Sequence, residues 1–176
     1  MKKIAFCLLT ACLFFQNCKK TEAGFDLTYR RAFTIDVGLN TIESHNFKFN
    51  DIASDTAVFF QANGGTSSAL VKQLVPRSMN IRTVFATDGS RLAFVDRVEV
   101  FISDPNRPQL GELPIFYRTD IPLSTDARID LFPENVDVQK FLFNARTYSM
   151  RLNFRFRETP TRSVDVEWNT DFLAKI

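Results

Sequence analysis

The stretch that decides the fold class is YSMRLNFRFR, residues 148–157. Apolar side chains occupy every second position from Tyr148 to Phe156, and polar side chains occupy the positions between them. Because successive side chains of a strand point to opposite faces of a sheet, this alternation predicts a half-buried β-strand.

The same alternation resumes over residues 163–176, where Val164, Val166 and Trp168 share one face. Between the two runs lies Pro160, which cannot donate to a strand ladder and therefore belongs in a connection. The two runs predict a long antiparallel hairpin that folds about Pro160 and places Arg155 opposite Asp165.

Shorter runs of the same kind extend this interpretation toward the N-terminus. Alternating or apolar runs occupy residues 33–37, 47–49, 56–60, 79–85, 98–102, 113–117 and 129–132. Residues 68–74 and 134–143 have a helical pattern instead. Short strands with turn signals between them are typical of a sandwich. The sequence therefore predicts an all-β fold, an antiparallel β-sandwich (immunoglobulin-like) with one or two short helices.

The N-terminus has a different character. Lys2 and Lys3 precede an uncharged apolar run of 12 residues, 4–15, which is too short to span a bilayer and ends close to Cys18. A basic start, an apolar run and a cysteine at its polar edge resemble a bacterial lipoprotein signal. The resemblance implies that Cys18 carries the lipid and that residues 1–17 are removed. Leu-Thr-Ala-Cys, residues 9–12, also fits the lipobox pattern, so Cys12 stays open as the modified residue.

This resemblance divides the chain into three parts: residues 1–17 as signal peptide, 18–24 as lipidated Cys18 and polar tether, and 25–176 as the sandwich domain. It also implies attachment through N-terminal acyl chains, because two or more such chains suffice for stable anchoring. Lys19 follows the lipidated cysteine, which implies the outer membrane of a Gram-negative bacterium. The side of that membrane stays open.

The composition of the chain indicates its domain count and which classes of partner to expect. The chain has 176 residues, a length that suits one domain, and its three cysteines, Cys7, Cys12 and Cys18, precede the domain. Removal of Lys2 and Lys3 leaves 20 basic and 20 acidic residues, so the mature formal net charge is zero. A neutral domain has no long-range field that attracts DNA or RNA, and we therefore expect no nucleic-acid partner.

Motifs for catalysis are sparse. His45 is the only histidine, and Ser44 or Asp51 would be its partners in a nucleophilic site, but adjacent residues of a strand point to opposite faces. Loop carboxylates are candidate calcium ligands without the spacing of a 12-residue calcium loop: Asp51, Asp55, Asp120, Asp126 and Asp130. We predict no catalytic residue, no cofactor and no metal site, and hence no enzyme.

The sequence supports three functions in this order. The first is a non-catalytic envelope lipoprotein, an interaction or structural module whose partner is another envelope protein or a glycan. The alternative is a carbohydrate-binding or adhesion domain that uses Trp168, Tyr117 or Tyr29 as a stacking platform. The third is a hydrolase that uses loop carboxylates.

Overall fold

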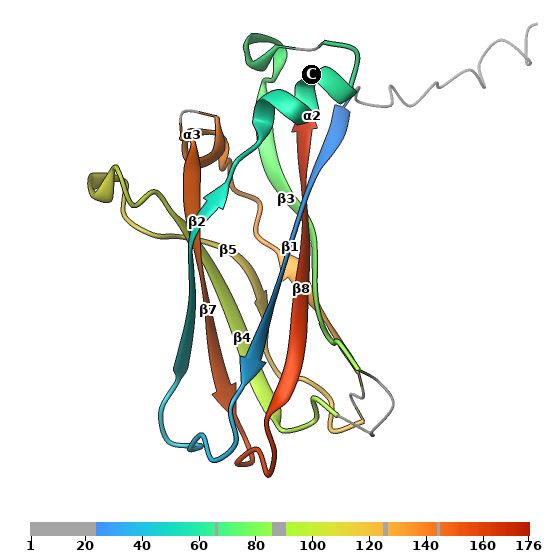
Figure 1. The fold of residues 1–176 in the computed structure, drawn as a ribbon, viewed down its shortest axis with the longest axis vertical. Helices are drawn as coiled ribbons and strands as arrows, with labels where there is room; N and C mark the ends of the chain where they lie inside the picture. The colour runs from blue at the N-terminus through green and yellow to red at the C-terminus, as the bar shows by residue number, and fades with distance from the viewer. Residues whose placement is uncertain (1–23, 66, 86–90, 125–126, 144) are drawn as a thin grey trace, which may run out of the picture.

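The computed structural model describes residues 24–65, 67–85, 91–124, 127–143 and 145–176 (Figure 1). The described residues form eight strands: β1 (Gly24–Ile35), β2 (His45–Ala53), β3 (Gln73–Thr83), β4 (Val95–Ser103), β5 (Leu113–Arg118), β6 (Arg128–Pro133), β7 (Thr147–Phe156) and β8 (Val164–Lys175). Short helical segments lie in the connections: α2 (Thr56–Ala62), η1 (Ser68–Leu70), η3 (Pro108–Leu110) and α3 (Gln139–Leu142).

The strands belong to one curled sheet in the order β1-β8-β3-β6-β5-β4-β7-β2, and every neighbouring pair is antiparallel. The pairing of β5 with β6 is short and joins two four-stranded halves, β1-β8-β3-β6 and β5-β4-β7-β2. The inner faces of the two halves pack on each other through aromatic contacts and form the core of a sandwich.

The predicted all-β antiparallel sandwich is confirmed. Its strand order is that of a jelly roll, an eight-stranded double-sheet fold, because the first strand pairs with the last and the second pairs with the seventh. An immunoglobulin domain places its strands in a different order, so the immunoglobulin-like detail is corrected to a jelly roll.

The predicted hairpin about Pro160 is wrong. The strand β7 pairs with β4 and β2, and the strand β8 pairs with β1 and β3, so the two runs lie in opposite halves. Residues 157–163 cross from one half to the other. Alternation reports which face of a strand is buried, and here it does so correctly for both strands, but it does not identify the neighbouring strand.

The helical predictions are partly correct. Only residues 68–70 of the predicted helix 68–74 are helical, as η1, and β3 begins at Gln73; only Gln139–Leu142 of 134–143 is helical, as α3. The apolar run 56–60 lies in α2, since a short apolar run does not distinguish a strand from a helix. No helix among the described residues has the length and apolar character needed to cross a membrane.

Aromatic side chains fill the space between the two halves. Rings from opposite halves meet in several pairs, among them Tyr29 of β1 with Tyr148 of β7 at 5.3 Å between centroids, Phe33 with Phe154 at 6.0 Å, and Trp168 of β8 with Phe49 of β2 at 5.7 Å. Edge-to-face and tilted pairs of this kind stabilise a core by about 0.5–1.5 kcal/mol each beyond the area they bury.

The connections gather at two ends of the sandwich (Figure 1). We call one end the helix end, because α2, η1, η3 and α3 lie there, in the described residues of connections 54–65, 67–72, 104–112, 134–143 and 145–146. We call the opposite end the loop end; it holds the described residues 36–44, 84–85, 91–94, 119–124, 127 and 157–163. The strand β1 begins at the helix end, where Phe25 packs on Phe60 of α2 at 5.5 Å.

Engineered disulfides distinguish the jelly roll from the hairpin. Thr34 of β1 and Asp165 of β8 are register partners, and the Thr34 hydroxyl donates to the Asp165 carboxylate at 2.7 Å. Opposed residues of antiparallel strands have Cα atoms about 4.5–5.5 Å apart, within the range that a disulfide bridges. We expect Thr34→Cys with Asp165→Cys to form a crosslink under mild oxidation, measured by peptide mapping without reduction.

The matched control keeps Asp165→Cys and combines it with Arg155→Cys, the pair that the hairpin would place together. We expect no crosslink in this variant because residues 155 and 165 lie in opposite halves. A crosslink in the control and none in the Thr34 pair would contradict the strand order described above.

Candidate interaction surfaces

Exposed apolar side chains concentrate at the loop end. Five of the exposed large apolar residues lie in or beside its described connections: Val37, Ile42, Val84, Phe85 and Leu123. The exposed fraction reaches 89% at Ile42 and 65% at Phe85. Single exposed apolar residues are ordinary, whereas several at one end of a domain are typical of an interaction surface.

The loop end is tied together by Arg157. Its Nη2 donates to the carbonyl oxygens of Val95, at 3.1 Å, and of Ile121, and it lies 3.4 Å from the carboxylate of Asp96. The backbone N–H of Gly38 donates to the carbonyl of Pro160 at 3.0 Å, which joins two further connections. The exposed apolar side chains therefore stand on connections that are fixed to one another, as a binding surface requires.

Only one of the three predicted stacking platforms is exposed. Trp168 is fully buried, and Tyr29 is buried with its hydroxyl donating to the carbonyl of Ser54, so burial raises the pKa of the Tyr29 phenol. Tyr117 remains 39% exposed. The alternation of residues 164–176 had already placed Trp168 on the apolar face.

Tyr117 has an aromatic neighbour that the sequence interpretation missed. Phe132 of β6, 49% exposed, is its register partner, with 5.9 Å between ring centroids, and the guanidinium of Arg118 lies 4.5 Å from the Phe132 centroid. We call Tyr117, Phe132 and Arg118 the seam cluster, because it lies where the two halves join. Ile129 and Leu131 point inward, so the alternation of β6 was the signal that could have placed Phe132 outward.

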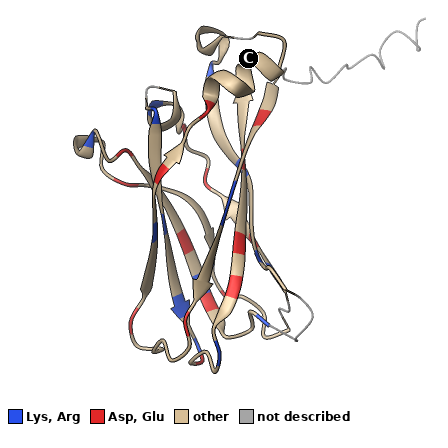
Figure 2. Ribbon diagram, in the orientation of Figure 1, with Lys and Arg blue, Asp and Glu red and all other residues tan. Residues whose placement is uncertain are grey.

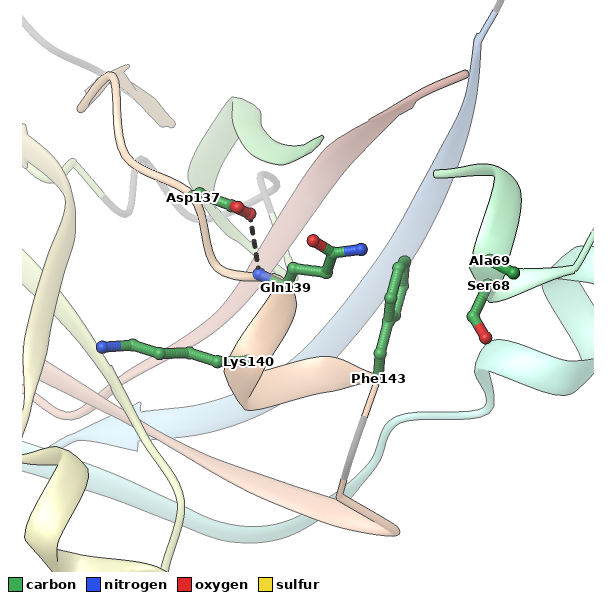
Figure 3. Close-up of a pocket in the computed structure, with 6 residues that line it drawn as sticks. All are labelled: Ser68, Ala69, Asp137, Gln139, Lys140 and Phe143. Atoms are coloured by element: carbon green, nitrogen blue, oxygen red, sulfur yellow. Dashed lines mark hydrogen bonds between the residues drawn. The ribbon is translucent and has the colours of Figure 1, made fainter. Parts of the chain in front are cut away.

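An open pocket of about 400 Å³ lies at the helix end between η1 and α3. Figure 3 shows its lining: Ser68, Ala69, Asp137, Gln139, Lys140 and Phe143. Two of its polar side chains already serve the fold. The Asp137 carboxylate accepts from the backbone N–H groups of Gln139 and Leu74, and the Gln139 amide donates to the carbonyl of Val71 at 3.1 Å. These bonds fasten α3 to η1 and β3.

Basic and acidic residues are interspersed along the strands of the sandwich (Figure 2). The cross-strand pairs differ from those that the hairpin predicted. Arg155 lies opposite Arg97, and Arg151 pairs with Glu112. Glu167 accepts from Arg82 at 2.8 Å, which holds the pKa of that carboxyl below its ordinary value. The Arg82–Glu167 pair joins β3 to β8, whose pairing the sequence had not revealed, and helps to fix their register on a wet face.

His45 has a structural setting. Its Nε2 lies 2.9 Å from the carbonyl oxygen of Asn40, and its ring stacks on Phe156 with 5.2 Å between centroids. It begins β2, whereas Asp51 lies near the other end of that strand, beside the register shift between Phe49 and Ile52. The structure shows no contact that joins His45 to Asp51.

The carboxylates named as candidate calcium ligands have structural settings, and two of them lie in strands, Asp51 in β2 and Asp130 in β6. Asp51, Asp55 and Asp120 have positive φ angles of 54°, 45° and 52°, a region that aspartate tolerates better than most residues. Asp130 pairs with Arg128 at 2.6 Å. Within the described residues, no group of three His, Cys, Asp or Glu side chains is arranged to hold a metal ion. Asp126, like Cys12 and Cys18, lies outside the described residues.

Comparison with known structures finds distant likenesses. The decameric BFDV capsid protein is 12% identical with a TM-score of 0.37, over 88% of this chain and 99% of that one. A Desmodium yellow mottle tymovirus structure is 12% identical with a TM-score of 0.27, over 87% and 88% of the two chains. A turnip yellow mosaic virus structure is 10% identical with a TM-score of 0.25, over 87% of this chain and 82% of that one. No family model and no curated protein matches the sequence.

One buried carboxylate braces the helix end. The Asp104 side chain is 1% exposed, lies 2.5 Å from Nε of Arg107, and accepts from the backbone N–H of Asn106 at 2.8 Å. Arg107 also donates to the carbonyl of Lys140 and so connects η3 to α3. Burial raises the pKa of Asp104, but the hydrogen bonds from Arg107 and Asn106 outweigh burial and hold this pKa below its ordinary 3.8.

We expect Asp104→Asn to lower the free energy of unfolding at pH 7 by about 1–2 kcal/mol, because a charge-assisted hydrogen bond is lost. A carboxyl whose pKa is lowered by folding stabilises the protein above its unfolded pKa and loses this effect as pH falls through its folded pKa. Urea titrations should therefore show the two proteins converging below pH 3.8. Asp130→Asn, on an exposed pair, is the control and should change stability by less than about 0.5 kcal/mol. A pH-independent difference at Asp104 would contradict this account.

Proposed function

We propose that this protein is a non-catalytic lipoprotein of a Gram-negative outer membrane that presents the loop end of its jelly roll to another envelope protein. The observation that carries the proposal is the placement of its exposed apolar residues. Among the described residues, five of the nine exposed large apolar side chains lie at the loop end, opposite to the end where β1 begins and the segment that contains Cys18 joins the domain.

The sequence supports the anchor. Lys2 and Lys3, the apolar run 4–15 and Cys18 resemble a lipoprotein signal, and Lys19 stands at the position that favours the outer membrane in that resemblance. Acyl chains on a terminal cysteine hold a domain at a bilayer without any spanning segment.

The fold supports the orientation. The strand β1 begins six residues after Cys18 and runs from the helix end to the loop end. Its 12 residues extend about 40 Å at 3.3 Å per residue. A lipid on Cys18 therefore places the helix end near the membrane and leaves the loop end accessible to a partner.

The side chains at the loop end favour a protein as the binding partner. Ile42, Phe85 and Leu123 come from three different connections, and Arg157 fixes two of the connections at this end. Apolar and aromatic side chains on a fixed backbone lose little conformational entropy on binding, and such residues dominate the energetics of protein interfaces. The charged residues nearby, including Asp96 and Arg157, give the surface a polar rim.

A carbohydrate-binding role is the second candidate, and the seam cluster favours it. Tyr117 and Phe132 are partly exposed, and the Arg118 guanidinium, which lies over the Phe132 ring, supplies hydrogen-bond donors beside them. Sugar rings stack their apolar faces on aromatic rings and direct their hydroxyl groups to neighbouring donors and acceptors.

The anchor and the partner are tested in cells. Intact mass of the membrane-extracted protein should show a chain that begins at Cys18 and carries acyl groups. Cys18→Ala should move the protein to the soluble fraction, whereas Cys12→Ala should leave it in the membrane. A photo-crosslinking residue at position 42 or 85 should form one discrete protein adduct, identified by mass spectrometry.

The matched control places the same photo-crosslinker at position 62 of α2, which is exposed at the helix end. No adduct with the same partner should form there. Adducts of the same partner at positions 42 and 62 alike would contradict the assignment to the loop end, and a native chain without acyl groups would contradict the anchor.

The carbohydrate alternative has its own measurement. If the seam cluster binds a glycan, a glycan array should give binding that Tyr117→Ala or Phe132→Ala reduces by about tenfold, since stacking on one ring contributes about 1–1.5 kcal/mol. Ile42→Ala should leave this binding unchanged. An array without binding would eliminate the alternative.

A further inference from the structure

We propose that the helix end is a membrane-seating face, in which the connection that carries α2 and η1 rests in the interfacial region of the lipid bilayer and orients the domain. This inference rests on the proposed function, because it requires the lipid at Cys18. It adds a second, non-covalent contact with the membrane.

The connection that carries α2 and η1 has an unusual composition. Residues 56–71 contain no Asp, Glu, Lys, Arg or His over 16 positions, in a chain that is 24% charged. Among its described residues, Val58 is 63% exposed and Leu70 is 56% exposed, and Ala57, Ala62 and Ala69 are exposed as well. We call the exposed residues of 56–71 the uncharged rim.

Packing forces the uncharged rim outward. On α2, Phe60 is buried against Phe25 of β1, and Phe59 packs on Tyr29 of β1 at 5.5 Å. These two rings hold one face of the helix on the sandwich, so Val58 on the other face points away from it. The rim is thus a surface that the fold holds in place, with the Val58 side chain largely exposed.

The short length of the tether, residues 18–24, limits how the uncharged rim can be oriented relative to the membrane. The six residues from Cys18 to Gly24 span at most about 20 Å when fully extended, whereas the sandwich is about 40 Å long, as judged from β1. A lipid-anchored Cys18 therefore cannot let the domain invert. The end that carries Gly24 and α2 stays next to the bilayer, and Figure 1 shows both at the same end.

The chemistry of the uncharged rim suits the interface of a bilayer. Apolar side chains enter the boundary between headgroups and acyl chains, about 5–10 Å deep, where buried charges would be opposed. Val58 and Leu70 belong to a segment without charged residues, and the charges at its η1 side include Asp137 and Lys140, which line the pocket with Ser68 and Ala69. Charged residues flank this segment on both sides: Asp55 precedes it and Lys72 follows it, and both are exposed. Their place at its border lets them stay at headgroup level while Val58 and Leu70 enter.

The test measures the depth of single labels in the full, acylated protein. Leu70→Cys is labelled with an environment-sensitive fluorophore and the protein is inserted into phosphatidylcholine vesicles that carry nitroxide on the upper acyl chain. We expect the nitroxide to reduce the emission at position 70 by about half, because a residue seated 5–10 Å into the interface lies beside the quencher. Ile42→Cys at the loop end is the matched control and should keep its emission.

A second set of variants keeps the test independent of the label at Leu70. With the fluorophore at Ala62→Cys, the double substitution Val58→Asp and Leu70→Asp should abolish quenching. The double substitution Val37→Asp and Ile42→Asp, which adds the same charges at the loop end, should leave it intact. All four positions are exposed, and circular dichroism verifies that each variant folds.

Two failures are distinguishable by intact mass. Acylated protein in which the label is quenched equally at positions 42 and 70, or at neither, overturns the seating face and leaves the anchor standing. A chain without acyl groups that does not sediment with vesicles overturns the proposed function and the seating face together.

Discussion

The pairing of β8 with both β1 and β3 is the constraint on which the rest of the structure depends. β8 lies between these strands, and Gly24 of β1 is opposite Lys175 near the far end of the chain. The inward residues of β8, Val166, Trp168 and Phe172, are fully buried. Because β8 is the last of the described strands and pairs with the first, the half that contains it needs both β1 and β8, whose sequence positions are more than 120 residues apart. Contacts of such long sequence separation make folding slow and cooperative.

Aromatic contacts between the halves supply the cohesion that this topology needs. Tyr29 with Tyr148, Phe33 with Phe154, and Phe49 with Trp168 each join a strand of one half to a strand of the other. The outer faces contribute specificity instead, since pairs such as Arg82 with Glu167 connect neighbouring strands in water and gain little energy. The result is a rigid body whose exposed large apolar side chains, among the described residues, lie at its two ends and in the seam cluster.

The candidate surfaces were predictable only where one strand carried the information. Tyr117 was named from the sequence and is exposed; Phe132 beside it was missed, although the inward alternation of Ile129 and Leu131 implied it. Trp168 and Tyr29 were named as platforms and are buried, because an aromatic residue on a strand is accessible only if its face is the outer one. The apolar loop end was not predictable, because Ile42, Phe85 and Leu123 are distant in sequence and meet through topology.

The sequence by itself determined the all-β class and the inward faces of β7 and β8, because both are written in local order, as period two along a strand. Tertiary structure alone decided that β7 and β8 lie in opposite halves of the sandwich and that Asp165 pairs with Thr34 instead of Arg155. It also decided that α2, in the segment after β2, packs beside the start of β1. The physical reason is that alternation states which face of a strand is apolar. It leaves open which strand completes its hydrogen bonds, and that choice is made by the packing of the whole core.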